Sequence, residues 1–275
     1  MGLFKSLFGK TERSSLTSDE KVPSSEKVIQ HMLVNAERCL ESNMPENAFE
    51  TYRQIVELAP NATAQYNLGS LYAQGKGTDQ DFLQAAYWFR QAVVNGAASA
   101  EKLLSKSTVD YLDQDLSEIT SYELYQKMQR YILFLYPKED GNSIAAKTLY
   151  GLAGHHFNKK EYAEAAKLFR TAGEYYNHGE SQNYLAVLYN SGAGLEKDDL
   201  AALYWFDRAA DNGVEISKKD RDGILNAYLQ NFSPEEFFDI METLARACIN
   251  STVDIPRDNE KAEYWRAQCE KLIRS

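Results

Sequence analysis

Residues 68–89 read LGSLYAQGKGTDQDFLQAAYWF, and residues 185–206 read LAVLYNSGAGLEKDDLAALYWF. The two stretches share the spacing of their leucine, tyrosine, glycine, aspartate and alanine residues, and both end in Tyr-Trp-Phe, 117 positions apart. Ala-x-x-Asn-Gly then follows each of them, at residues 92–96 and 209–213. Such repetition predicts a stack of similar units, because one unit can bury its apolar face only against a neighbouring copy.

A shorter pattern precedes each of these copies and fits the frame of a tetratricopeptide helix pair. Ala36 and Ala48 stand 12 residues apart, and so do Ala153 and Ala165, again at the offset of 117. In the Tyr-Trp-Phe units the matching small residues stand 16 apart. The four additional residues fall in the turn between the two helices, where both glycines lie.

This longer turn, together with the Leu-Gly and Tyr-Trp-Phe elements, resembles the Sel1-like repeat, a relative of the tetratricopeptide repeat. The resemblance implies an all-α fold, a right-handed α-solenoid of stacked antiparallel helix pairs over residues 26–275, preceded by a flexible segment at 1–25. Four kinds of unit are expected: tetratricopeptide-like pairs at 26–60 and 143–177, Sel1-like pairs at 61–97 and 178–214, degenerate pairs at 98–142 and 215–249, and a partial copy at 250–275.

The most distinctive residues of the repeat are predicted to pack and cap helices. Small residues let two helices approach, the Tyr-Trp-Phe aromatics form the core, and glycines allow the left-handed backbone at a helix end. Asp81 and Asp198 stand at expected N-caps, and Ser-x-x-Glu or Thr-x-x-Glu boxes begin at Thr120 and Ser233. The predicted structural residues are Gly69, Tyr72, Gly75, Gly77, Trp88, Ala92, Ala186, Tyr189, Gly192, Gly194, Trp205, Ala209 and Trp265.

The partial copy at the C-terminal end keeps Asp258, Ala262 and Trp265 at the repeat positions, whereas Arg266 replaces the phenylalanine. A polar residue in a normally buried position indicates a terminal unit whose outer face meets water, as in capping repeats.

Composition excludes several classes of protein. The 275 residues are 44% hydrophobic and 25% charged, as in ordinary globular proteins. A net charge of −10 argues against a nucleic-acid partner, which needs clustered Lys and Arg. Cys39, Cys248 and Cys269 form no CxxC motif and cannot all pair, which favours a reducing compartment. With neither a long apolar stretch nor a secretory signal, we expect a cytoplasmic protein, and the cysteine-poor chain suggests a bacterial source.

No catalytic or metal motif occurs in the sequence, so neither an enzymatic activity nor a cofactor or metal is expected. His155 and His156 are adjacent, and on a helix they point about 100° apart, so they cannot chelate one ion together. His156 falls at a position that faces the next helix, where a hydrogen-bonded core histidine is expected. A hydrolase that uses His155 or His156 is the enzymatic alternative.

The resemblance also implies where a partner would bind. Groove positions lie three before, and one, four and five after, the small residue of the first helix in each pair. They are Tyr66, Ser70, Ala73, Gln74, Tyr150, Gly154, Phe157, Asn158, Asn183, Val187, Asn190 and Ser191. These neutral side chains can hydrogen-bond an extended peptide, and they lack the Lys and Arg that would clamp a C-terminal carboxylate. Alternatively, several merely face water, and a partner uses the convex face or the irregular helices.

The N-terminal segment is a second candidate site. Leu3, Phe4, Leu7 and Phe8 would share one face of a helix, so the segment could dock on another protein or lie on the inner face of a membrane. Met1-Gly2 with Ser6 fits the pattern for N-myristoylation, and a disordered tail is the remaining alternative.

Together these patterns predict a monomeric, non-enzymatic adaptor that binds a partner protein or an extended peptide on its solenoid surface. Sel1-like proteins are commonly such scaffolds. The alternative within the binding class is an inhibitor or immunity-type protein that masks a toxin or an enzyme.

Overall fold

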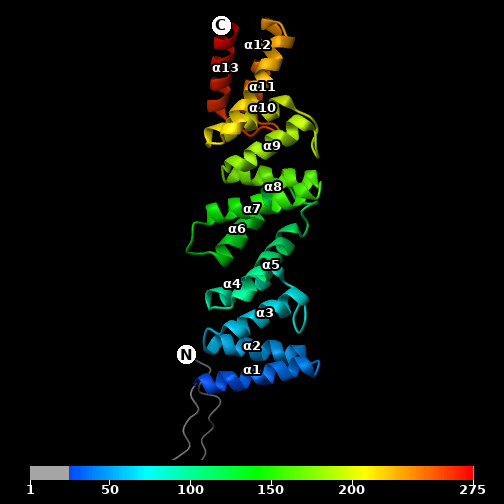
Figure 1. The fold of residues 1–275 in the computed structure, drawn as a ribbon, viewed down its shortest axis with the longest axis vertical. Helices are drawn as coiled ribbons and strands as arrows, with labels where there is room; N and C mark the ends of the chain where they lie inside the picture. Colours follow the sequence, from blue (N-terminus) through cyan, green and yellow to red (C-terminus); the bar gives the residue numbers. More distant parts are fainter. Residues whose placement is uncertain (1–24, 275) are drawn as a thin grey trace, which may run out of the picture.

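The computed structural model describes residues 25–274, and within this range every regular element is helical. The helices stack along one long axis, with α1 at one end and α13 at the other (Figure 1). In chain order they are α1 (Ser25–Glu41), α2 (Pro45–Leu58), α3 (Ala62–Gln74), α4 (Phe82–Val94), the 3-10 helix η1 (Ala98–Ala100), α5 (Glu101–Asp113), α6 (Ser121–Leu135), α7 (Gly141–Asn158), α8 (Tyr162–Tyr175), α9 (Gly179–Ser191), α10 (Asp199–Asp211), α11 (Glu215–Asn231), α12 (Pro234–Asn250) and α13 (Asn259–Arg274).

Helices that follow each other in the chain form the closest packing partners. The main pairs are α1 with α2, α3 with α4, α7 with α8, α9 with α10, and α12 with α13. Two of these pairs also pack directly on the next pair, through α2 on α3 and α8 on α9. This arrangement confirms the predicted all-α solenoid. Within residues 25–274 no helix is both long and apolar enough to cross a membrane.

The predicted helix starts are confirmed. The Asp81 carboxylate accepts hydrogen bonds from the backbone N–H groups of Leu83 and Gln84 at 2.9 and 3.0 Å. Asp198 does the same at the start of α10. Both predicted capping boxes are also present, before α6 and before α12. Local residue patterns therefore determine where these helices begin.

The glycine turns set the distance between successive helix pairs. Gly194 has a φ of +72°, and a Cβ atom there would lie 2.5 Å from the backbone nitrogen of Ala163 in the first turn of α8. At the matching position in the first copy, a Cβ on Gly77 would lie 2.5 Å from the carbonyl carbon of Pro45, at the start of α2. The turn inside each Tyr-Trp-Phe unit thus touches the backbone of the preceding pair, and only glycine fits.

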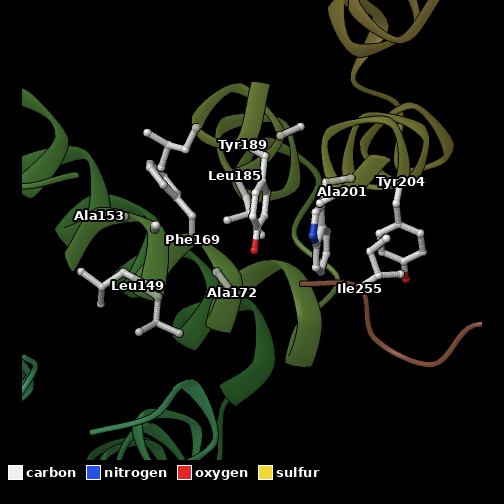
Figure 2. Close-up of a cluster of buried hydrophobic side chains, with 14 of the residues drawn as sticks. Leu149, Ala153, Phe169, Ala172, Leu185, Tyr189, Ala201, Tyr204 and Ile255 are labelled. Carbon is white, nitrogen blue, oxygen red and sulfur yellow. The ribbon is translucent and has the colours of Figure 1, made fainter. Parts of the chain in front are cut away.

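The centre of the core lies in the second copy. Leu185 and Tyr189 of α9 point toward Phe169 and Ala172 of α8 (Figure 2). Tyr204, Trp205 and Phe206 are each at most 1% exposed. This part of the prediction for the Tyr-Trp-Phe triplet is confirmed.

The first Tyr-Trp-Phe triplet departs from the prediction, because only Phe89 is fully buried, whereas Tyr87 and Trp88 stay partly exposed. The second triplet is covered by residues 251–258, which lie before α13. Ile255 of this segment lies next to Tyr204 (Figure 2), and the indole N–H of Trp205 donates to the backbone oxygen of Asp254 at 2.9 Å. A long-range contact thus makes the two triplets differ.

The C-terminal helices combine differently from the sequence pattern, which groups residues 215–249 as one pair. In the structure α11 packs on α10, and α12 packs mainly on α13. The buried stripe of α12, which includes Phe237 and Met241, belongs to the same cluster as Trp265. Arg266 is exposed and donates to Glu242 of α12 at 2.8 and 2.7 Å, so α13 presents a polar outer face.

The stack is less regular at its middle. Helix α5 packs on α4, whereas α6 packs mainly on α8, and α5, α6 and α7 make few contacts with one another. Because these three helices diverge, side chains do not fill all the space between them. The opening that results is described below.

Candidate partner-binding surfaces

Aromatic rings from two successive helix pairs meet at the surface of α7 and α9. The ring centre of Tyr184 lies 5.5 Å from that of Phe157 and 6.0 Å from that of Tyr150. Tyr184 also stacks on the buried ring of Phe169 at 5.0 Å, with 9° between the ring planes. Tyr150, Phe157 and Tyr184 are all partly exposed, so one side of the cluster remains open to solvent.

Neutral polar groups border these rings. Asn158 and Asn190 are exposed, and their side chains form no hydrogen bond with any residue in the range 25–274. Burial raises the pKa of Tyr150 above its ordinary value, and the neighbouring Tyr184 raises it further, so the Tyr150 hydroxyl is neutral at physiological pH. We refer to Tyr150, Phe157, Asn158, Tyr184, Val187 and Asn190 as the aromatic face.

A pocket of about 580 Å³ lies between α5, α6 and α7, where these helices diverge. Apolar side chains such as Leu104, Val109 and Leu152 form much of its wall. The buried hydroxyls of Thr108 and Tyr131 also line it and lie 2.8 Å apart. The complete lining is Leu104, Ser105, Lys106, Thr108, Val109, Leu112, Tyr131, Tyr136, Lys147, Thr148, Gly151, Leu152 and His155.

Basic side chains supply the charge of this pocket. Lys106, Lys147 and His155 line it, and no aspartate or glutamate does. Lys106 forms an ion pair with Asp110 of its own helix at 2.7 Å. Lys147 forms no ion pair with any residue of the described range. The contrast with the chain's net charge of −10 shows that this is a local concentration of basic groups.

His156 is not among the residues that line the pocket, and it is a structural residue. It is 6% exposed, and its two ring nitrogens lie 2.8 Å from carboxylate oxygens of Asp113 and Glu161. Both nitrogens are thereby engaged, which leaves none on His156 to act as a base. His155 is exposed, and its ring is turned 81° from that of His156. Among the described residues, no group of three or more His, Cys, Asp or Glu could hold a metal ion.

The repeated units match a known family model. The sequence model for the Sel1 repeat matches residues 62–93, 179–214 and 244–265. These three stretches of the chain are Sel1 repeats. The third Sel1 match spans the end of α12 and the first half of α13, the two helices that pack together in the structure.

Two solved structures of Sel1-type proteins resemble this one. A Sel1 repeat protein from Oxalobacter formigenes is 19% identical, with 89% of this chain and 88% of that chain covered and a TM-score of 0.28. The other is c5321, described as a protective antigen of uropathogenic Escherichia coli strains with an SLR fold. It is 17% identical, with 90% of this chain and 55% of that chain covered and a TM-score of 0.33. The present chain therefore spans about half the length of c5321.

The predicted groove residues of the first Sel1 repeat are largely engaged within the chain. Tyr66 meets the ring of Phe89 edge-on at 5.8 Å, and the Ser70 hydroxyl donates to the backbone oxygen of Tyr66 at 3.0 Å. Gln74 is exposed. In the second Sel1 repeat, Asn183 accepts a hydrogen bond from Ser217 at 2.7 Å. The structure thus gathers Tyr150 and Phe157 into one surface, and Tyr66 and Ser70 do not belong to it.

Tyr184 is the surface residue that the sequence pattern misses. Its position, two residues before the small residue Ala186, is not a groove position in the tetratricopeptide frame. A comparison of the two Sel1 repeats contains the signal: the first has Tyr66-Asn67, whereas the second has Asn183-Tyr184. This exchange moves the ring from a contact inside its own pair to a contact with Phe169 of the preceding pair.

The N-terminal candidates Leu3, Phe4, Leu7 and Phe8 lie outside the described residues, and their docking role stays a prediction.

Proposed function

We propose that this Sel1 repeat protein is a non-enzymatic scaffold that holds a partner protein on its aromatic face. One observation supports the proposal above all. Rings from α7 and α9 form a continuous cluster that the chain's own packing leaves open on one side. Buried aromatic anchors commonly carry much of the binding energy at protein interfaces.

The polar groups around the cluster favour an extended segment of the partner. The amide groups of Asn158 and Asn190 can each donate to and accept from a peptide backbone. No charged side chain belongs to the aromatic face. The part of the partner that contacts this face therefore needs no charged group. The net charge of −10 also favours a protein over a nucleic acid as the partner.

Arginine substitutions at exposed positions test the proposal. Asn158→Arg with Asn190→Arg places two bulky cations beside the rings, close to the C-terminal ends of α7 and α9, where a positive charge suits the helix dipole. We expect this double variant to fold and to lose the partner captured from native cells by the wild-type protein. The control is Leu58→Arg with Val94→Arg, two exposed residues that end α2 and α4.

Capture that is equal for the wild type and the aromatic-face variant would refute the proposed site. Failure of the wild-type protein to capture any specific partner would refute the scaffold. If the captured partner is an enzyme whose activity is abolished by one-to-one binding, the inhibitor role follows instead.

A further inference from the structure

We propose that the pocket between α5, α6 and α7 receives a large apolar side chain from an acidic peptide segment of the partner. The proposal rests on the scaffold function and assigns a second contact for the same partner. One continuous segment of the partner would then contact both the aromatic face and the pocket.

The cavity has the size and lining of a binding pocket. Its volume of about 580 Å³ lies within the range of roughly 300–1,000 Å³ that is typical of ligand sites. Leucine and valine side chains from α5 and α7 form the apolar part of its wall, and the hydroxyls of Thr108 and Tyr131 also line it. The Thr108 hydroxyl donates to the backbone oxygen of Leu104 at 2.9 Å, so it is already paired. An apolar side chain can therefore enter the pocket without leaving the Thr108 hydroxyl unpaired.

Gly151 lines the pocket, and contacts within the chain do not require a glycine at this position. It lies inside α7, and a Cβ atom at this position would meet nothing within 4 Å. A glycine inside a helix costs about 0.5–1 kcal/mol relative to alanine. Neither a left-handed backbone nor a close neighbour in the chain requires glycine here. Gly154 and Gly223 also lie inside helices with nothing within 4 Å of a Cβ, so the glycine alone does not mark a site. Gly151 differs from them because it lines the pocket, where the missing side chain leaves room for a ligand backbone to approach closely.

The charges around the pocket select an acidic segment. Lys147 and His155 lie one helical turn to either side of Gly151 on the same face of α7. Lys147 has no carboxylate partner within the described residues, whereas Lys106 of α5 also lines the pocket but is paired with Asp110 at 2.7 Å. Aspartate or glutamate next to the apolar anchor would pair with Lys147, whereas a basic segment would be repelled by it.

The pocket and the aromatic face share helix α7. Gly151 and His155 line the pocket together with residues of α5 and α6. Tyr150 and Phe157 of the same helix contact Tyr184 of α9. A peptide that crosses α7 near Gly151 would therefore contact both sites.

Peptide display on the full-length protein tests this inference, and the best peptide is then measured by fluorescence anisotropy. We expect selected peptides to carry a large apolar residue flanked by Asp or Glu. Gly151→Leu fills the pocket with a residue that favours helix and should weaken binding about tenfold or more, equivalent to 1.4 kcal/mol. Gly223→Leu is the matched control, because Gly223 is exposed inside α11 and also has nothing within 4 Å of a Cβ. It should bind within about twofold of the wild type.

Charge reversal provides the second variant. Lys147→Glu should weaken binding of the acidic peptide and lessen its salt dependence, because one attractive charge becomes repulsive. Selected peptides without an apolar anchor, or an affinity that Gly151→Leu leaves unchanged, would overturn the inference. So would a failure to select any peptide, or binding of dodecanoate, a probe for a simple apolar anion, without binding of any peptide.

The two proposals fail in different ways. If Asn158→Arg with Asn190→Arg abolishes capture of the native partner and Gly151→Leu does not affect it, the scaffold stands and the pocket inference falls. If the native partner is lost in neither case, the scaffold site itself is wrong.

Discussion

Substitution of Gly194 tests how successive helix pairs are joined. Gly192 and Gly194 lie in the same turn and have nearly equal φ values of +70° and +72°. They differ in what a Cβ atom would meet. At Gly192 the nearest atom is the Cβ of the Lys197 side chain at 3.3 Å, whereas at Gly194 it would lie 2.5 Å from the backbone nitrogen of Ala163. Alanine at the two positions therefore separates backbone strain from a collision with α8.

The expected magnitudes follow from these two terms. A left-handed conformation costs a non-glycine residue about 1–2 kcal/mol, and this is the whole expected effect of Gly192→Ala. Gly194→Ala incurs the same cost and must also move the turn away from α8 by about 1 Å to restore an ordinary contact. Forcing an additional group into a packed site typically costs about 1–3 kcal/mol. The total for Gly194→Ala is therefore about 2–5 kcal/mol.

Thermal unfolding and native-state hydrogen exchange measure the difference. A further loss of about 1–3 kcal/mol should lower Tm by about 2–4 °C per kcal/mol in a protein of this size. Repeat arrays can unfold in parts, so exchange of the α8–α10 amides should accelerate more in Gly194→Ala than in Gly192→Ala. The first copy offers the same comparison with Gly75 and Gly77. Equal destabilisation by both alanines would refute the claim that the turn at Gly194 packs against the backbone of α8.

Three further predictions concern the C-terminal part of the chain. Asp254→Ala should destabilise it by about 1–3 kcal/mol in thermal unfolding, because the buried Tyr189 hydroxyl donates to Asp254 at 2.6 Å. Burial raises the pKa of the Cys248 thiol to about 12, so this thiol should resist alkylation at pH 8 and react once the protein is unfolded in urea. Arg266 lowers the pKa of Glu242 to about 2. The stability from this pair should therefore be present above pH 4.5 and vanish as pH falls through 2. Glu242→Gln should accordingly be less stable than the wild type near neutral pH and equally stable in acid.

Local features of this fold could be predicted from sequence because neighbouring residues determine them. The cap at Asp81 needs only the backbone N–H groups two and three residues ahead. Gly75 and Gly192 are predicted at helix ends because few other residues adopt left-handed backbone there. The all-α stack follows from the repeat of these same local units.

Features that depend on distant contacts could not be predicted in this way. The residue after Tyr-Trp-Phe is Arg90 in one copy and Asp207 in the other. Asp207 is 1% exposed and pairs with Arg221 at 2.6 Å and with Lys261 of α13. These partners lie 14 and 54 residues further along the chain, and no spacing rule connects them to Asp207.

The candidate site was predictable in part for the same reason. Tyr150 and Phe157 occupy family positions on the first helix of their pair. Tyr184 joins them through a stack with Phe169 of another pair. The pocket arises because α5, α6 and α7 diverge, which is a property of packing and not of any single motif.

Photo-crosslinking in native cells tests the central claim most directly. A benzophenone amino acid is placed at Asn158 or Asn190, which are exposed on the aromatic face, and at Leu58 or Val94, which are exposed where α2 and α4 end. The account predicts one partner crosslinked from Asn158 and from Asn190, and none from Leu58 or Val94. A partner crosslinked only from Leu58 or Val94 would contradict it.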